Sequence, residues 1–127
     1  MRKEAEGPVV WIVSGEQWTR ALLRAELIER GYDAVGHARL GHALSPAVLA
    51  LRRPQALVLD LHGQEISPAE QARLLELRIP IIALIPAGAR AELARPALRD
   101  IPFAAVLRRP LTIAGIAEAV EQTLPPT

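Results

Sequence analysis

The hydrophobic residues of this chain fall into five short runs, and polar segments separate them. The runs cover residues 9–13, 32–35, 56–60, 79–85 and 103–107. A continuous apolar run of this length is typical of a strand buried on both faces, as in a parallel sheet. We therefore predict five strands, the third ending at Asp60.

The segments between the runs show helical periodicity with start and stop signals. Trp18, Leu22, Ala25 and Ile28 recur at helical spacing, and Gly31 follows as a stop. This spacing predicts a first helix that ends at Gly31.

Three later helices begin at recognisable caps. Ser45-Pro46 predicts a helix through about Arg52, and Ser67-Pro68 with Glu70 predicts a capping box. The latter helix should direct Leu74, Leu75 and Leu77 toward the sheet, and Thr112 should cap a last helix with an inner stripe of Ile113, Ile116, Val120 and Leu124.

One further helix is expected over residues 89–99, where Pro96 predicts a kink or a ragged end. Strand and helix then alternate five times, which indicates an α/β fold with a parallel sheet covered on both faces. We expect one domain over residues 8–124, with loose tails at 1–7 and 125–127.

Composition narrows the class of protein. The 127 residues are 50% hydrophobic and 3% aromatic, so the core should be aliphatic. There is no cysteine, no run long enough to span a bilayer and no signal peptide, which favours a cytoplasmic domain. A net charge of +1 gives no electrostatic case for binding nucleic acid or a membrane surface.

Asp60 is the first candidate for chemistry. A lone carboxylate is costly inside a buried strand unless it is paired, so Asp60 should lie where the strand emerges. In open α/β sheets, ligands and reacting groups gather at the carboxyl ends of the strands.

Four segments in order resemble the receiver domains of response regulators, which have a CheY-like, flavodoxin-type fold. They are Val10–Val13, Ala56–Gly63, Ile79–Leu84 and Leu107–Leu111. The resemblance implies a doubly wound sheet of strand order 2-1-3-4-5, a part in two-component signal transduction or a phosphorelay, and Asp60 at the phosphoacceptor position.

Other positions of the resemblance depart from the family pattern. The two acids that hold Mg²⁺ beside the acceptor are replaced by Ser14 and Gly15, and the conserved lysine of the Lys-Pro turn is Arg109, followed by Pro110. Two switch positions are also changed: the hydroxyl residue after the fourth strand is Ile85, and the aromatic residue of the fifth strand is Val106.

These departures predict a degenerate pseudo-receiver. Mg²⁺ requires several oxygen ligands, and phosphoryl transfer depends on its electrostatic stabilisation. We expect Asp60 to pair with Arg109, no resident cofactor, no catalytic activity, and a function in binding a protein.

Two alternatives remain. A phosphorylatable receiver could hold Mg²⁺ weakly through Glu16 and Asp60, although a solvated Glu16 is the simpler expectation. A small ligand could instead bind the crevice, as in many flavodoxin-like folds.

The resemblance also predicts where a partner binds. In receivers, the surface of the fourth helix, fifth strand and fifth helix commonly holds a partner protein or a second copy. Five arginines lie in this third of the chain: Arg90, Arg95, Arg99, Arg108 and Arg109. Arginine is enriched at interfaces, so we rank this surface first.

Overall fold

Five parallel strands form one sheet with the order β2-β1-β3-β4-β5, as predicted. The computed structural model describes residues 7–86, 98 and 100–126. The strands are β1 (Val9–Val13), β2 (Asp33–His37), β3 (Ala56–Asp60), β4 (Ile81–Ile85) and β5 (Ala105–Arg108). Every residue of β1, β3 and β4 is buried, which explains why these strands are continuous apolar runs.

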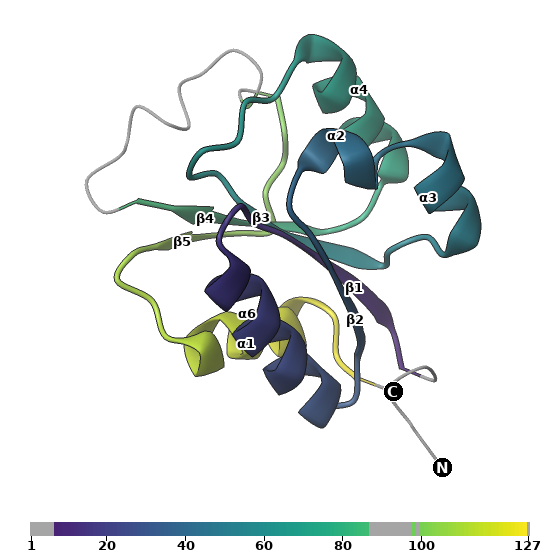
Figure 1. The fold of residues 1–127 in the computed structure, drawn as a ribbon. Helices are drawn as coiled ribbons and strands as arrows, with labels where there is room; N and C mark the ends of the chain where they lie inside the picture. Colours follow the sequence, from purple (N-terminus) through teal and green to yellow (C-terminus); the bar gives the residue numbers. More distant parts are fainter. Residues whose placement is uncertain (1–6, 87–97, 99, 127) are drawn as a thin grey trace.

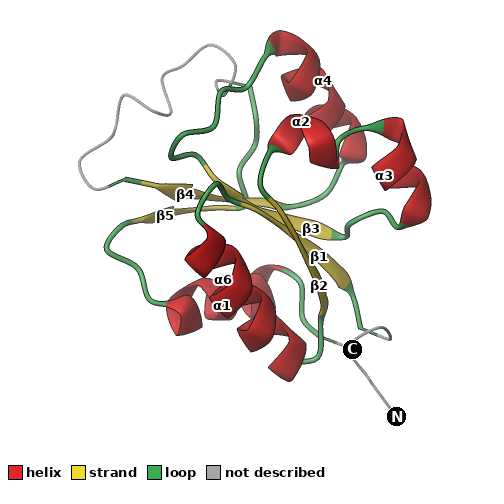
Figure 2. Ribbon diagram, viewed as in Figure 1, coloured by secondary structure: helices red, strands yellow, loops and turns green. Residues whose placement is uncertain are grey.

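Helices cover both faces of the sheet (Figure 1). One layer contains α1 (Gln17–Glu29) and α6 (Ile113–Thr123), and the other contains α2 (Leu40–Ala43), α3 (Pro46–Leu51) and α4 (Pro68–Leu77). Figure 2 shows the three helices α2, α3 and α4 together on one side of the strands, opposite α1 and α6.

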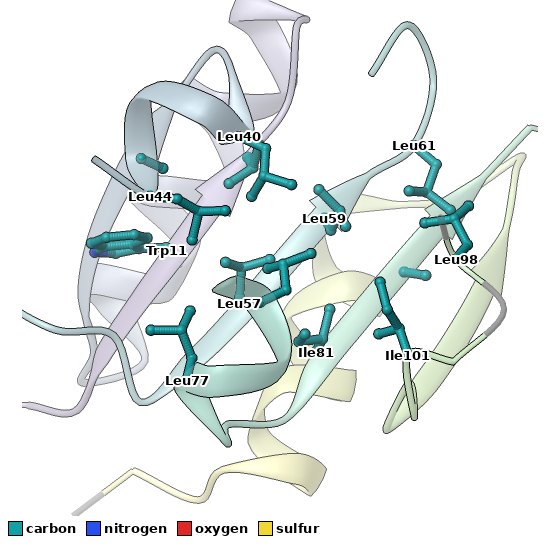
Figure 3. Close-up of a cluster of buried hydrophobic side chains, with 14 of the residues drawn as sticks. Trp11, Leu40, Leu44, Leu57, Leu59, Leu61, Leu77, Ile81, Leu98 and Ile101 are labelled. Carbon is teal, nitrogen blue, oxygen red and sulfur yellow. The ribbon is translucent and has the colours of Figure 1, made fainter. Parts of the chain in front are cut away.

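The core consists of two apolar clusters, one on each face of the sheet. Alternate residues of a strand point to opposite faces, so Val10 and Ile12 belong to the cluster beneath α1 and α6. Trp11 and Leu57 belong to the cluster beneath α2, α3 and α4, where Figure 3 shows them among aliphatic side chains. The alternation of side chains along each strand therefore supplies apolar residues to both faces of the sheet, and each helical layer packs on one of them.

The predicted caps are present. The Ser67 hydroxyl accepts from the Glu70 N–H at 3.1 Å, and the Glu70 carboxylate accepts from the Ser67 N–H at 2.9 Å, which completes the capping box. The Ser45 hydroxyl caps α3 by accepting a hydrogen bond from the backbone N–H of Val48. The Thr112 hydroxyl caps α6 in the same way, by accepting from the backbone N–H of Gly115. Each such cap is worth about 1 kcal/mol.

Several boundaries differ from the sequence prediction. Strand β2 covers Asp33–His37, later than the predicted 32–35, and Tyr32 before it is buried in the core. Strands β4 and β5 each begin two residues later than expected. The four-residue helix α2 was not predicted; it is too short for a periodic signal. The helix predicted over 89–99 lies outside the described residues.

Of the four residues at helical spacing in α1, Ile28 packs against the core cluster beneath α1 and α6, and the other three are exposed. Leu23 and Leu27 are the buried residues of α1, whereas Trp18 is 77% exposed and Leu22 is 49% exposed. Both sets have helical spacing, so periodicity did not distinguish them. In α4, Leu74 and Leu77 are buried as expected, but Leu75 is 39% exposed. The inner stripe of α6 is confirmed: Ile116 and Val120 are buried, and Ile113 and Leu124 pack against the same cluster.

Tyr32, the only tyrosine of the chain, joins the end of α1 to the end of α6. Its side chain is fully buried, and its hydroxyl donates a hydrogen bond to the carbonyl oxygen of Leu124. Burial, with a smaller contribution from the Glu121 carboxylate, raises the pKa of the Tyr32 phenol to about 12.

The shifted pKa of Tyr32 predicts a loss of stability at alkaline pH. An unfolded tyrosine loses its proton near pH 10, whereas the folded one keeps it to about 12, so the free energy of unfolding falls as pH rises between these values. Denaturant titrations should show a fall of about 2 kcal/mol in this window for the native sequence. Tyr32→Phe should cost about 1 kcal/mol at neutral pH and reduce the alkaline fall. Equal alkaline losses in the two proteins would contradict this assignment.

Candidate functional site

The carboxylate of Asp60 is the centre of a hydrogen-bonded cluster at the carboxyl edge of the sheet. The residue is fully buried. Its Oδ2 accepts from the Ser14 hydroxyl and from Nη2 of Arg109, both at 2.8 Å. Its Oδ1 accepts from the backbone N–H of His62 at 3.2 Å. Both carboxylate oxygens are therefore engaged by protein donors.

Sheet topology brings these residues together. Strands β1 and β3 are neighbours with Val13 opposite Leu59, so Ser14 and Asp60 emerge side by side. Arg109 follows β5, two strands away from β3, and its backbone N–H donates to the carbonyl of Ile85 at 2.9 Å. Its long side chain crosses the end of β4 to reach Asp60. The Arg109–Pro110 peptide bond is cis.

Glu16 is the second carboxylate at this site. The same Nη2 atom of Arg109 lies 2.9 Å from its Oε1, which also accepts from the Thr19 hydroxyl at 3.0 Å. Arg109 thus bridges Asp60 and Glu16. Glu16 is exposed, as expected for a solvated residue at the start of α1, and its side chain additionally forms an ion pair with Arg109.

Ser14 connects the two ends of this cluster. Its hydroxyl donates to Asp60 and accepts from the Glu16 N–H at 3.1 Å, and its carbonyl accepts from Nη1 of Arg20 at 2.7 Å. The contributions of Thr19 and Arg20 were not anticipated from sequence. The only sequence signal for either is that Thr19 carries a hydroxyl three residues after Glu16, the N-cap residue of α1.

The donor set fits Mg²⁺ poorly. Two carboxylates are present, and each is already bonded to the guanidinium of Arg109. Gly15 contributes no side chain, and the Ser14 hydroxyl is directed at Asp60. Within the described ranges, no group of three or more His, Cys, Asp or Glu residues could hold a metal ion. Mg²⁺ is reluctant to lose its waters and is held by carboxylates, so a paired carboxylate is a weak ligand for it.

The two switch positions lie close to this cluster. Ile85 is fully buried, so the end of β4 presents a methyl surface where a hydroxyl would be needed to bond a phosphoryl oxygen. Val106 is 38% exposed on the edge strand β5. Their roles in signalling stay predictions.

A polar hollow of about 840 Å³ lies next to the cluster. Its walls come from the loops after β1, β2 and β3 and from the helices α2 and α4; among them are Gly15, Arg39, His42, Gln64 and Glu70. No Trp, Tyr or Phe is among the described residues that line it. Its described lining therefore offers no aromatic surface of the kind that flavins and nucleotide bases stack on, and the small-ligand alternative stays a prediction.

Two histidines stand near this hollow. The rings of His37 and His42 are 6.2 Å apart, and His37 also packs its edge against Trp11. Burial, with a smaller effect of His42, lowers the pKa of the His37 imidazole. The half-buried position of His37 at the end of β2 therefore favours the neutral form of its ring.

Comparison with known proteins identifies the fold. No family model and no curated protein matches the sequence. Among solved structures, the receiver domain of NtrX from Brucella abortus has a TM-score of 0.71 at 18% identity, over 91% of this chain and 97% of that one. A CheY chemotaxis protein of Vibrio cholerae has a TM-score of 0.72 at 16% identity, over 92% of this chain and 98% of that one.

The chain has the CheY-like receiver fold. A third structure, the signal receiver domain of a modulated diguanylate cyclase from Desulfovibrio desulfuricans, has a TM-score of 0.72 at 21% identity, over 92% of this chain and 93% of that one. At these identities the comparison describes the receiver fold alone, and function has to be argued from the site. No helix in the described part of the chain is long and apolar enough to cross a membrane.

Proposed function

We propose that this chain is a cytoplasmic receiver-fold signalling module that acts by binding a protein partner, without Mg²⁺-dependent phosphorylation of Asp60. The observation that carries the proposal is the Arg109 guanidinium, which lies 2.8 Å from Asp60 and 2.9 Å from Glu16. No catalytic step is assigned to the chain.

The electrostatics of the cluster support this proposal. An arginine stays protonated at all physiological pH values, so Arg109 supplies a permanent positive charge next to Asp60. A divalent cation would have to approach that charge and compete for carboxylate oxygens that already accept hydrogen bonds. Phosphoryl transfer to Asp60 would then lack the metal that stabilises its transition state.

The contact between Arg109 and Asp60 also favours one fixed conformation of the domain. Arg109 ties the turn after β5 to the end of β3, and its backbone ties that turn to β4. A receiver-fold module held in this way would present a constant surface to its partner. Exposed Val106 and Arg108 on β5 belong to the surface that we propose for this partner, with α6 beside them; the helix predicted over 89–99 lies outside the described residues.

The alternative of a phosphorylatable receiver has one observation in its favour. Asp60 and Glu16 contact the same nitrogen of Arg109, so the two carboxylates lie near each other. If Arg109 swung outward, both would be available to a metal. Under this alternative, Mg²⁺ would be the cofactor and Asp60 the phosphoacceptor.

A magnesium titration distinguishes the proposed protein-binding module from the phosphorylatable receiver. Trp18 lies two positions after Glu16 and is exposed, so its fluorescence should report a cation at this site. We expect no saturable change at millimolar Mg²⁺ beyond that produced by a monovalent salt of equal ionic strength. A saturable change that is lost in both Asp60→Asn and Glu16→Gln would favour the alternative.

A further inference from the structure

The outer face of α1 is an apolar stripe in solvent. It consists of Trp18, Ala21, Leu22 and Ala25, at positions i, i+3, i+4 and i+7, and all four are exposed. The opposite face of α1 buries Leu23 and Leu27 on the sheet. One apolar face is enough to pack α1 on its own sheet, so the second apolar face is available for contact with another molecule.

The exposure of Trp18 is the strongest part of this observation. Its side chain is 77% exposed, and that of Leu22 next to it is 49% exposed. Tryptophan is enriched among the residues that contribute most to protein interfaces, and a contiguous exposed apolar patch marks an interaction surface more often than a lone apolar residue does.

The order of residue sizes along the stripe points to a second copy of this chain as the occupant. We propose that two copies associate through antiparallel packing of α1 on α1, about a twofold axis between Ala21 and Leu22. In this arrangement Trp18 of each copy faces Ala25 of the other, and Leu22 faces Ala21. Each large side chain thus meets a small one, which is the self-complementarity that a twofold interface requires.

The charges of α1 are compatible with the same pairing. Arg24 comes opposite Thr19, and Glu26 opposite Gln17, so within α1 no like charges face each other. The exposed Glu29 at the end of one helix lies near the beginning of the other, where the positive helix dipole attracts it and exposed Glu16 repels it, so this end contributes little net attraction. Parallel packing would instead place Trp18 against Trp18 and Glu29 against Glu29.

The size of the face sets the strength of the association. A helix of 13 residues is about 20 Å long, so one helix pair buries much less than the ~800 Å² per partner of a stable complex. The dimer should therefore be weak and concentration-dependent. This inference is independent of the phosphorylation state of Asp60, and the surface differs from the one on β5 and α6 proposed for a protein partner.

Sedimentation across micromolar to millimolar protein tests the association. The average mass should rise from the 13.8 kDa of the monomer toward twice that value. Trp18→Ser and Ala25→Glu should each weaken the association about tenfold or more. Leu51→Ser is the matched control, because Leu51 is 84% exposed on α3 and lies on the other side of the sheet; it should leave the association unchanged. A monomer at all concentrations, or equal losses in the Leu51 control, would overturn the proposal.

Cysteine cross-linking tests the orientation, since the chain has no cysteine of its own. Leu22→Cys lies next to the proposed axis and should form a disulfide-linked dimer under mild oxidation. Ala25→Cys, which keeps Trp18, should not, because the two copies of residue 25 would be about 10 Å apart along the helices, and a disulfide requires Cα atoms within ~7 Å. A mixture of Trp18→Cys and Ala25→Cys should cross-link as a heterodimer. Efficient self-linking of Ala25→Cys would overturn the antiparallel arrangement.

Discussion

Arg109→Met should lower the free energy of unfolding by about 3 kcal/mol, the largest loss that we expect from any exposed or half-exposed side chain at the site. The substitution keeps most of the apolar stem of Arg109 but removes the guanidinium. Fully buried Asp60 then retains the Ser14 hydroxyl and the His62 N–H as donors, without an opposite charge. Denaturant unfolding followed by circular dichroism measures the loss.

Two control variants test whether the loss of stability comes from the unpaired charge of Asp60 or from a disturbed turn around position 109. Glu16→Gln removes the half-exposed partner of Arg109 and should cost at most about 1 kcal/mol. Asp60→Asn in the Arg109→Met background removes the unpaired charge and should recover most of the lost stability. If Arg109→Met costs less than about 1 kcal/mol, or if the second substitution recovers nothing, Asp60 does not depend on the guanidinium.

A variant with Ser14→Asp, Gly15→Asp and Arg109→Lys should gain a dependence on Mg²⁺ that the native sequence lacks. Ser14 already directs its side chain to Asp60, so a carboxylate there would stand beside that of Asp60. A Cβ at Gly15 would meet only the Gln64 amide, at 3.9 Å, so a side chain fits. Lysine keeps the charge at position 109 but cannot bond two carboxylates as a planar fork.

The carboxylates of Asp60, Glu16 and the two added acids repel one another without a cation, so this variant should be less stable than the native chain in chelator. Saturating Mg²⁺ should raise its melting temperature by roughly 5 °C or more, because a ligand that binds only the folded state stabilises it. A variant with Ala47→Asp and Ala50→Asp on exposed positions of α3 is the control, since it adds two acids away from the site. An equal response of the two variants to Mg²⁺ would show that the effect is general electrostatic screening.

The sheet and its caps could be predicted from sequence because their signals are local. Continuous apolar runs such as Ala56–Asp60 indicate buried parallel strands, and a Ser-Pro pair with glutamate at the third helical position indicates a capping box. The strand order came from the resemblance to receiver domains, and the structure has the same order.

The contacts that define the site depend on the tertiary structure. Arg109 and Glu16 are 93 positions apart, and nothing local in the sequence indicates that one guanidinium would bridge Glu16 and Asp60. The outward face of α1 could not be predicted for a related reason: Trp18 and Leu22 have the same spacing as Leu23 and Leu27, and only the position of the sheet decides which pair is buried.

Intact-mass spectrometry after incubation with acetyl phosphate and Mg²⁺ is the most direct test of the central claim that Asp60 is not a phosphoacceptor. The variant that carries the two added acids and Arg109→Lys serves as a positive control, and Asp60→Asn as a negative one. We expect the native chain to keep its unmodified mass while the positive control gains a phosphoryl group. A phosphoryl adduct on the native chain that disappears in Asp60→Asn would contradict it.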